Sequence, residues 1–98
     1  MGPRYVIIRS YSSGVFIGQL VAIEPSGTGR RRATLHKSRR LWKWVAQEGV
    51  ALSGVATHGL KMSESKVDSE IAGAHEIDDV IEVIDASDNA VEVIYGTK

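Results

Sequence analysis

The segment from Tyr5 to Glu24 constrains the fold most strongly. It opens with YVIIRSY, a run of β-branched and aromatic residues at Tyr5–Tyr11, and after Ser12-Ser13-Gly14 it continues with VFIGQLVAIE. Such residues favour strands, and a three-residue connection ending in glycine favours a tight turn between antiparallel neighbours. The segment therefore predicts a β-hairpin. Gly18, inside the second strand, indicates a bulge or the close approach of another backbone.

The length and composition predict one small globular domain, spanning residues 1–98, in which 43% of the residues are hydrophobic. No apolar run approaches the ~20 residues that a membrane-spanning helix requires, and the first residues do not resemble a signal peptide. The sequence contains no cysteine, which excludes disulfides, a thiol nucleophile and a cysteine zinc site. We therefore expect a cytoplasmic protein, and its small core leads us to expect a homo-oligomer.

Two further segments have the composition of strands. The first, ATLHKSRRLWKW at Ala33–Trp44, reads as an extended strand with an interruption near Ser38. The second, IDDVIEVI at Ile77–Ile84, also fits a helical period, but its β-branched residues favour a strand.

Helices are expected in two places. Val50–His58 carries apolar residues at helical spacing, and Gly59 is a suitable residue to end a helix. Near the C-terminus, Ser87 or Asp88 offers an N-cap and Gly96 an end, although the repeated triplet Glu-Val-Ile leaves a β-hairpin as the alternative. Together these segments predict an α+β fold: a small, mainly antiparallel sheet of four to six strands with one or two short helices.

A net charge of zero conceals a division between the two halves of the chain. Residues 1–48 hold nine lysines and arginines against two acids, whereas residues 49–98 hold three lysines against ten acids, giving +7 and −7. Either the basic half binds a polyanion or a phosphate ligand, or the two halves pair with each other, within one chain or between subunits. Arg30-Arg31-Arg32, which follow a turn rich in Gly and Pro, are expected to form a mobile basic loop.

The basic and aromatic segment SRRLWKW is the strongest candidate for a binding site. In an extended strand Arg40, Trp42 and Trp44 share one face, and Arg39 lies on the other. A guanidinium recognises phosphate and an indole ring stacks on a base, which is the combination that binds nucleotides and single strands. The alternative is that the tryptophans fill the core and the arginines are solvated. Separately, because Arg39 falls on the opposite face, an ion pair with an acid such as Asp79 or Glu82 is the alternative to its place in the site.

The turn of the first hairpin completes the candidate site. Tyr11 ends a strand where its ring is expected to be partly exposed, and the Tyr-Ser-Ser-Gly turn would offer hydroxyls and N–H groups to an anion. The candidate ligand-binding residues are therefore Tyr11, Ser13, Arg39, Arg40, Trp42 and Trp44.

The order of these segments resembles a family of small uncharacterised proteins of tailed phages and prophages. The resemblance rests on the Tyr-Ser-x-Gly turn at Tyr11–Gly14 and on the Arg-Arg-Leu-Trp-x-Trp segment at Arg39–Trp44, and it covers roughly residues 5–84. It implies an accessory phage protein, acting in the host cytoplasm, and it implies no particular chemistry.

Catalysis has little support in the sequence. The three histidines are scattered without the spacing of metal ligands, and no glycine spacing matches a P-loop or a dinucleotide fingerprint. Asp78 and Asp79 are adjacent, so a strand would point them to opposite faces and prevent them from acting as a pair. Ser12, Ser13 and Ser38 have no recognisable base partner. We expect no catalytic residue, no metal site and no cofactor.

The expected function is that of a non-enzymatic accessory protein that binds an anionic ligand, either a nucleotide-like small molecule or nucleic acid. Sequestration of a host signalling nucleotide is one form that this role would take. The alternative is a protein-interaction module that inhibits or recruits a host protein through the same Trp and Arg surface, since these residues are common interface anchors.

Overall fold

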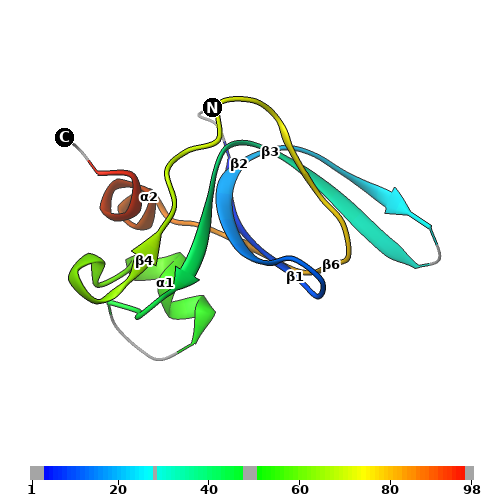
Figure 1. The fold of residues 1–98 in the computed structure, drawn as a ribbon. Coiled ribbons are helices and arrows are strands. Elements are labelled where there is room, and N and C mark those ends of the chain that lie inside the picture. Colours follow the sequence, from blue (N-terminus) through cyan, green and yellow to red (C-terminus); the bar gives the residue numbers. More distant parts are fainter. Residues whose placement is uncertain (1–3, 28, 48–50, 97–98) are drawn as a thin grey trace.

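The computed structural model describes residues 4–27, 29–47 and 51–96, and it confirms the α+β prediction. These residues form a six-stranded antiparallel sheet and two α-helices (Figure 1). Within the described ranges, neither helix has the length and apolar character needed to cross a membrane. The elements are β1 (Tyr5–Ser10), β2 (Gly14–Ser26), β3 (Arg30–Lys43), α1 (Leu52–His58), a 3-10 turn (Met62–Glu64), β4 (Lys66–Val67), β5 (His75–Ile77), β6 (Val80–Asp85) and α2 (Asp88–Tyr95).

The sheet curls strongly, because its two edges are joined by a very short connection. The strand order is β4-β3-β2-β1-β6, and β5 pairs with the same outer edge of β3 as β4 does. β5 and β6 therefore lie on opposite edges of the sheet, yet only Asp78 and Asp79 separate them in sequence. Asp79 has φ +58°, the left-handed conformation that makes a sharp corner. The result is a small barrel-like sheet, with the β2–β3 hairpin projecting to the right in Figure 1.

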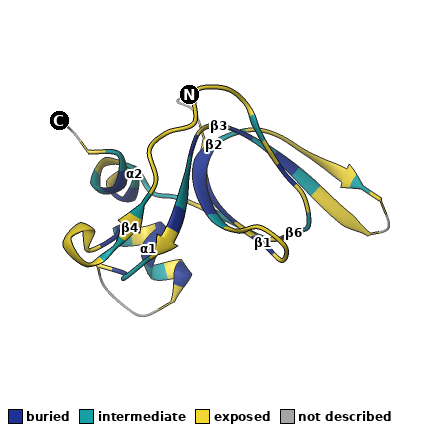
Figure 2. Cartoon of the chain, in the orientation of Figure 1, coloured by how far each residue is buried: buried dark blue, intermediate teal, exposed yellow. Residues whose placement is uncertain are grey.

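The curled sheet separates two hydrophobic clusters, and β1 is buried on both faces. Val6 and Ile8 belong to the inner cluster, whereas Ile7 between them belongs to the outer cluster. The inner cluster fills the curl with one or two residues from each strand except β4: Val6, Ile8, Phe16, Ala33, Leu35, Ile77 and Val80. The outer cluster joins the sheet to both helices: Ile7, Ile17, Leu41, Ala46, Leu52, Val55, Ala56, Leu60 and Ile94. Figure 2 shows this central burial and the exposed hairpin tip.

A bulge in β3 exchanges the faces of that strand. Lys37 has φ +56°, and the register with β2 shifts between the pairs Ile17–Arg39 and Gln19–His36. The predicted interruption near Ser38 is therefore present. Because one extra residue reverses the alternation, Leu35 lies in the inner cluster and Leu41 in the outer one, although a regular strand would place both on one face.

The first hairpin and both helices follow the sequence prediction. Gly18 lies opposite the same register shift, and a Cβ atom built there would be 3.1 Å from the backbone carbonyl oxygen of His36, so the predicted bulge and the predicted close approach of a backbone are both present at this place. Helix α1 ends before Gly59 (φ +88°), and its predicted first residue, Val50, lies outside the described residues. Ser87 Oγ accepts a hydrogen bond from Ala90 N–H at 3.0 Å and caps α2, so the alternative of a C-terminal hairpin is wrong.

Two predictions, one of a strand and one of a loop, were incorrect in detail. The single strand expected at Ile77–Ile84 is two strands, β5 and β6, divided by the Asp78–Asp79 corner. The basic loop expected at Arg30–Arg32 is instead the beginning of β3, whose residues pair in order with Ser26, Pro25 and Glu24 of β2.

Candidate functional site

Four arginines of the basic half pair with carboxylates of the acidic half, within one chain. Two of the acids form the β5–β6 corner and two lie on β6, and all four pairs are partly exposed. We call these four pairs the clasp: Arg4–Asp85 (2.8 Å), Arg9–Glu82 (3.6 Å), Arg30–Asp79 (2.6 Å) and Arg32–Asp78 (2.9 Å). The clasp ties β6 and the corner to β1 and β3, so much of the charge division in the sequence is neutralised by folding.

The corner carboxylates are stabilised in their ionised form. The hydrogen bond from Arg32 lowers the pKa of Asp78, with a further contribution from Ser26. The hydrogen bond from Arg30 lowers the pKa of Asp79 in the same way. Each acid thus has its own cation, and the two do not form the shared-proton pair that acid–base catalysis uses.

Arg40 packs against two aromatic rings. Its guanidinium carbon is 4.8 Å from the ring centre of Phe16 and 4.9 Å from that of Trp42. We call Phe16, Arg40 and Trp42 the stack. Phe16 is fully buried, whereas 56% of the Trp42 surface is exposed, so the stack reaches from the inner cluster to solvent. Among the described residues, Arg40 forms no ion pair with a carboxylate. It is thus a fixed cation without the partner that the clasp arginines have.

His75 lies beside this stack. Its ring meets Phe16 edge to face at a centroid distance of 5.1 Å, and its Nδ1 is 2.9 Å from Ser38 Oγ. Burial, and then the charge of Arg40, lower the pKa of His75. The prediction that Ser38 has no base nearby is therefore wrong. Ser38 is nevertheless fully buried, so this contact is a hydrogen bond of the interior and not an accessible nucleophile and base.

Arg39 and Trp44 lie on the other side of the sheet. The Arg39 guanidinium donates to the carbonyls of Asp68 (2.7 Å) and Ile94 and lies 5.5 Å from the Tyr95 ring centre, so it fastens α2 to β3. It does not pair with Asp79 or Glu82, which bind other arginines. β3 ends at Lys43, and Trp44 packs half-buried against the outer cluster. The expected shared face of Arg40, Trp42 and Trp44 is therefore limited to Arg40 and Trp42.

The β1–β2 turn supplies a different surface. Tyr11 is 79% exposed, as expected, but its backbone N–H donates to the Asp79 carbonyl at 3.0 Å, which places it against the β5–β6 corner. Ser13 is exposed, and its N–H donates to Ser10 Oγ at 3.1 Å. That N–H is consequently already used within the turn, which weakens the idea of an anion-binding nest there.

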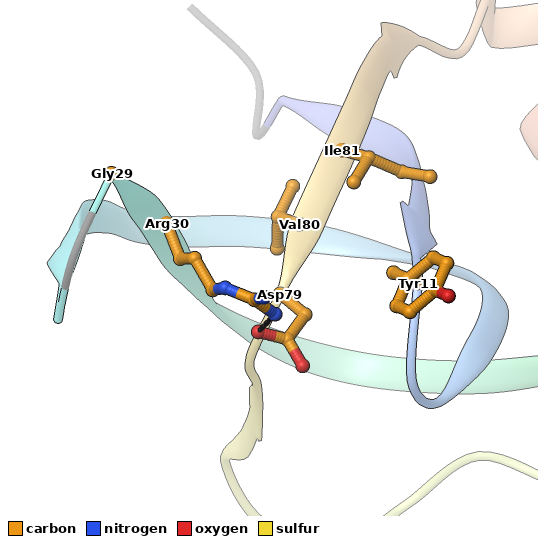
Figure 3. Close-up of a pocket in the computed structure, with 6 residues that line it drawn as sticks. All are labelled: Tyr11, Gly29, Arg30, Asp79, Val80 and Ile81. Atoms are coloured by element: carbon orange, nitrogen blue, oxygen red, sulfur yellow. Dashed lines mark hydrogen bonds and ion pairs between the residues drawn. The ribbon is translucent and has the colours of Figure 1, made fainter.

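A groove of about 350 Å³ opens beside Tyr11 (Figure 3). The Arg30–Asp79 ion pair and Gly29 stand on one side, and the ring of Tyr11 stands on the other, with β6 between them. The groove is lined by Tyr11, Gly29, Arg30, Asp79, Val80 and Ile81. Of the residues that the sequence proposed for a site, only Tyr11 lines this groove.

The sequence revealed only part of the stack. The segment Arg40-Leu41-Trp42 revealed the exposed part of the stack, because Arg and Trp two positions apart share a face of a strand. Phe16 and His75 were missed, since they reach Arg40 only through the pairing of β2 and β5 with β3. Their only sequence signal is that Phe16 lies in the predicted hairpin.

The comparisons with known proteins give a family and no further relative. No curated protein and no solved structure matches this chain. One family model matches residues 3–94, nearly the whole chain and every described strand and helix except the end of α2. The chain therefore belongs to the family described as a domain of unknown function, DUF6948.

Proposed function

We propose that this domain binds an anionic ligand with a planar ring, such as a nucleotide or single-stranded nucleic acid, at Arg40 and Trp42. The observation that carries the proposal is the contrast among the arginines. Four of them have a carboxylate partner, whereas Arg40 has two aromatic rings and, among the described residues, no ion pair. An anion would supply the missing partner.

The stack suits phosphate recognition for two physical reasons. Phe16 and Trp42 both pack against the flat guanidinium, so less side-chain entropy is lost when its N–H groups bind an anion. Trp42, more than half exposed, offers an apolar ring face on which a base would stack. Each contact is modest alone, and the two together distinguish a nucleotide from free phosphate.

The role we propose is that of a non-catalytic accessory protein. The fully buried Ser38 and the separately paired acids Asp78 and Asp79 favour binding over catalysis. The resemblance to small phage proteins supports an accessory role in the host cytoplasm, such as sequestering a signalling nucleotide. Self-association stays a prediction, and the intramolecular clasp removes the charge argument for it.

A titration with four probes tests the proposal. AMP, adenosine, inorganic phosphate and tetrathymidylate are added to the full chain, and binding is followed by tryptophan fluorescence and calorimetry. We expect AMP or tetrathymidylate to bind more tightly than adenosine or phosphate, because only they offer ring and anion together. Arg40→Gln should weaken that binding by about 10- to 100-fold, the loss of one charge-assisted contact.

Arg31→Gln is the matched control, because Arg31 is an exposed arginine on the same strand that forms no ion pair among the described residues. If Arg40→Gln binds as well as Arg31→Gln, or if none of the four probes binds at millimolar concentration, the proposal is wrong. Salt separates nucleic acid from the rival protein ligand, since binding to nucleic acid weakens steeply with ionic strength.

A further inference from the structure

We infer that the groove beside Tyr11 is a second binding site, which takes an extended peptide segment carrying an aliphatic side chain next to a carboxylate. This site is separate from the Arg40 stack: no residue of the stack lines the groove. The inference rests on the apolar exposure, the accessible charge and the free strand edge at this place in the fold.

Apolar surface is exposed along the groove, on the side of Tyr11 (Figure 3). Tyr11 is 79% exposed and Ile81 is 54% exposed. Ile81 occupies a bulge of β6: Val80 pairs with Ser10 and Glu82 with Arg9, so no residue of β1 stands opposite Ile81. A bulge turns a side chain away from its regular direction and often occurs at a binding site. At about 350 Å³ the groove has room for an aliphatic side chain.

The accessible charge in the groove is positive. The Arg30 side chain is 57% exposed, whereas its partner Asp79 is only 22% exposed. Arg30 gives one hydrogen bond to Asp79, and a guanidinium has five N–H donors, so donors remain for a ligand. A single carboxylate complements this wall, because Arg30 is the one cation among the described residues that line the groove, whereas a nucleic-acid backbone carries a charge on every nucleotide. Charge complementarity therefore favours an acidic peptide over nucleic acid.

The strand edge favours an extended ligand. β6 pairs with β1 along one edge, and within the described residues no strand pairs with its other edge. An open edge presents backbone N–H and C=O groups to an added strand, and charges usually protect such an edge from pairing. Here the acids of β6, Glu82 and Asp85, are already paired with Arg9 and Arg4. The edge is thus neutralised and available beside the exposed Ile81.

A selection from displayed random heptapeptides, followed by titration of the enriched peptide, tests the inference on the full chain. We expect enriched sequences to share an aliphatic residue within two positions of Asp or Glu. In NMR spectra the peptide should shift the signals of Tyr11 and Ile81. Ile81→Ser and Arg30→Gln should each weaken its binding by about tenfold, as for anchor residues of an interface.

Each variant has a matched control. Val21→Ser removes an equally exposed aliphatic residue (53%) from β2 outside the groove, and Arg31→Gln removes the neighbouring exposed arginine; both should bind within about twofold of the original chain. Melting curves confirm that all four variants fold.

Absence of enrichment, enriched peptides without an acid, or equal binding by Ile81→Ser and Val21→Ser would each overturn the inference. So would a dimer in sedimentation that buries Ile81, or shifts at Tyr11 and Ile81 caused by tetrathymidylate alone. Because Arg40→Gln should bind the peptide normally, failure of one site is distinguishable from failure of the other.

Discussion

The two ends of β3 carry arginines with different surroundings. At its beginning, Arg30 and Arg32 meet Asp79 and Asp78 of the β5–β6 corner. Toward its end, Arg40 packs against Phe16 and Trp42 and, among the described residues, forms no ion pair with a carboxylate. Both sets belong to the same basic half of the sequence. A charge count therefore predicts a binding surface only after the cations that the fold neutralises have been subtracted.

The bulge at Lys37 produces this difference. Before it, the even-numbered Arg30 and Arg32 lie on the outer side of β3, because Ala33 and Leu35 fill the inner cluster. After it, the even-numbered positions face inward, so Arg40 lies over Phe16. A strand without this extra residue would place Arg40 on the same side as the clasp arginines. One backbone irregularity therefore separates the candidate site from the ion pairs.

The largest effect is expected from removing Phe16, the buried ring of the stack. Phe16 is fully buried in the inner cluster and supports both Arg40 and His75. Phe16→Ala should lower the free energy of unfolding by about 3–5 kcal/mol, because it leaves a cavity in a packed core. Urea denaturation measures the loss. A loss below about 1 kcal/mol would show that the ring is not part of a packed core.

The two tryptophans should give a smaller and unequal effect. Trp44 packs half-buried against the outer cluster, so Trp44→Ala should cost about 2 kcal/mol of stability, roughly half of the usual loss for a fully buried ring. Trp42 is 56% exposed, so Trp42→Ala should cost only about 0.5 kcal/mol while weakening AMP binding. Thermal melts and the AMP titration on both variants measure this. Equal stability losses, or lost binding in Trp44→Ala alone, would reverse the assignment of core and site.

The stability of the fold should depend on pH through the corner carboxylates of the clasp. The pKa values of Asp78 and Asp79 are lowered by Arg32 and Arg30, so the folded state binds protons less readily than the unfolded chain. Their contribution to stability is present above the unfolded pKa and is lost as the pH falls below about 4. The double variant Asp78→Asn, Asp79→Asn should therefore lose less of its melting temperature on acidification than the original chain.

Glu64→Gln serves as the control, because Glu64 is exposed and forms no ion pair among the described residues. Its acid dependence should equal that of the original chain. A double variant that follows the original curve as closely as Glu64→Gln would show that the corner carboxylates do not support the fold.

The sequence predicted well what depends on neighbouring residues. The first hairpin, the end of α1 at Gly59 and the Ser87 cap of α2 all follow from local composition. It did not predict what depends on long-range pairing. The Asp78–Asp79 corner needs a residue at φ +58°. Aspartate tolerates this conformation, but only the pairing of β5 and β6 with opposite edges of the sheet requires the corner.

The same holds for the candidate site: positions that depend on near neighbours were predicted, and contacts with distant segments were not. Arg40 and Trp42 were identified because a two-residue spacing is enough to put them on one face. Trp44 was assigned to the same face, but β3 ends at Lys43 and the chain turns toward the outer cluster. Arg39 was assigned to the site because nothing local reveals that the carbonyls of Asp68 and Ile94 lie within its reach.

The pKa of His75, measured by NMR with and without an anion, tests the central claim that Arg40 is the cation that binds an anionic ligand. Burial and the Arg40 charge both lower this pKa, so an anion on Arg40 should raise it toward the ordinary value. The probe is cyclic AMP, whose single negative charge does not change near neutral pH. We predict a rise in the original chain and in Arg31→Gln. Arg40→Gln should start with a higher pKa and show no further rise. An unchanged pKa in the original chain under saturating cyclic AMP, or an equal rise in Arg40→Gln, would contradict the account.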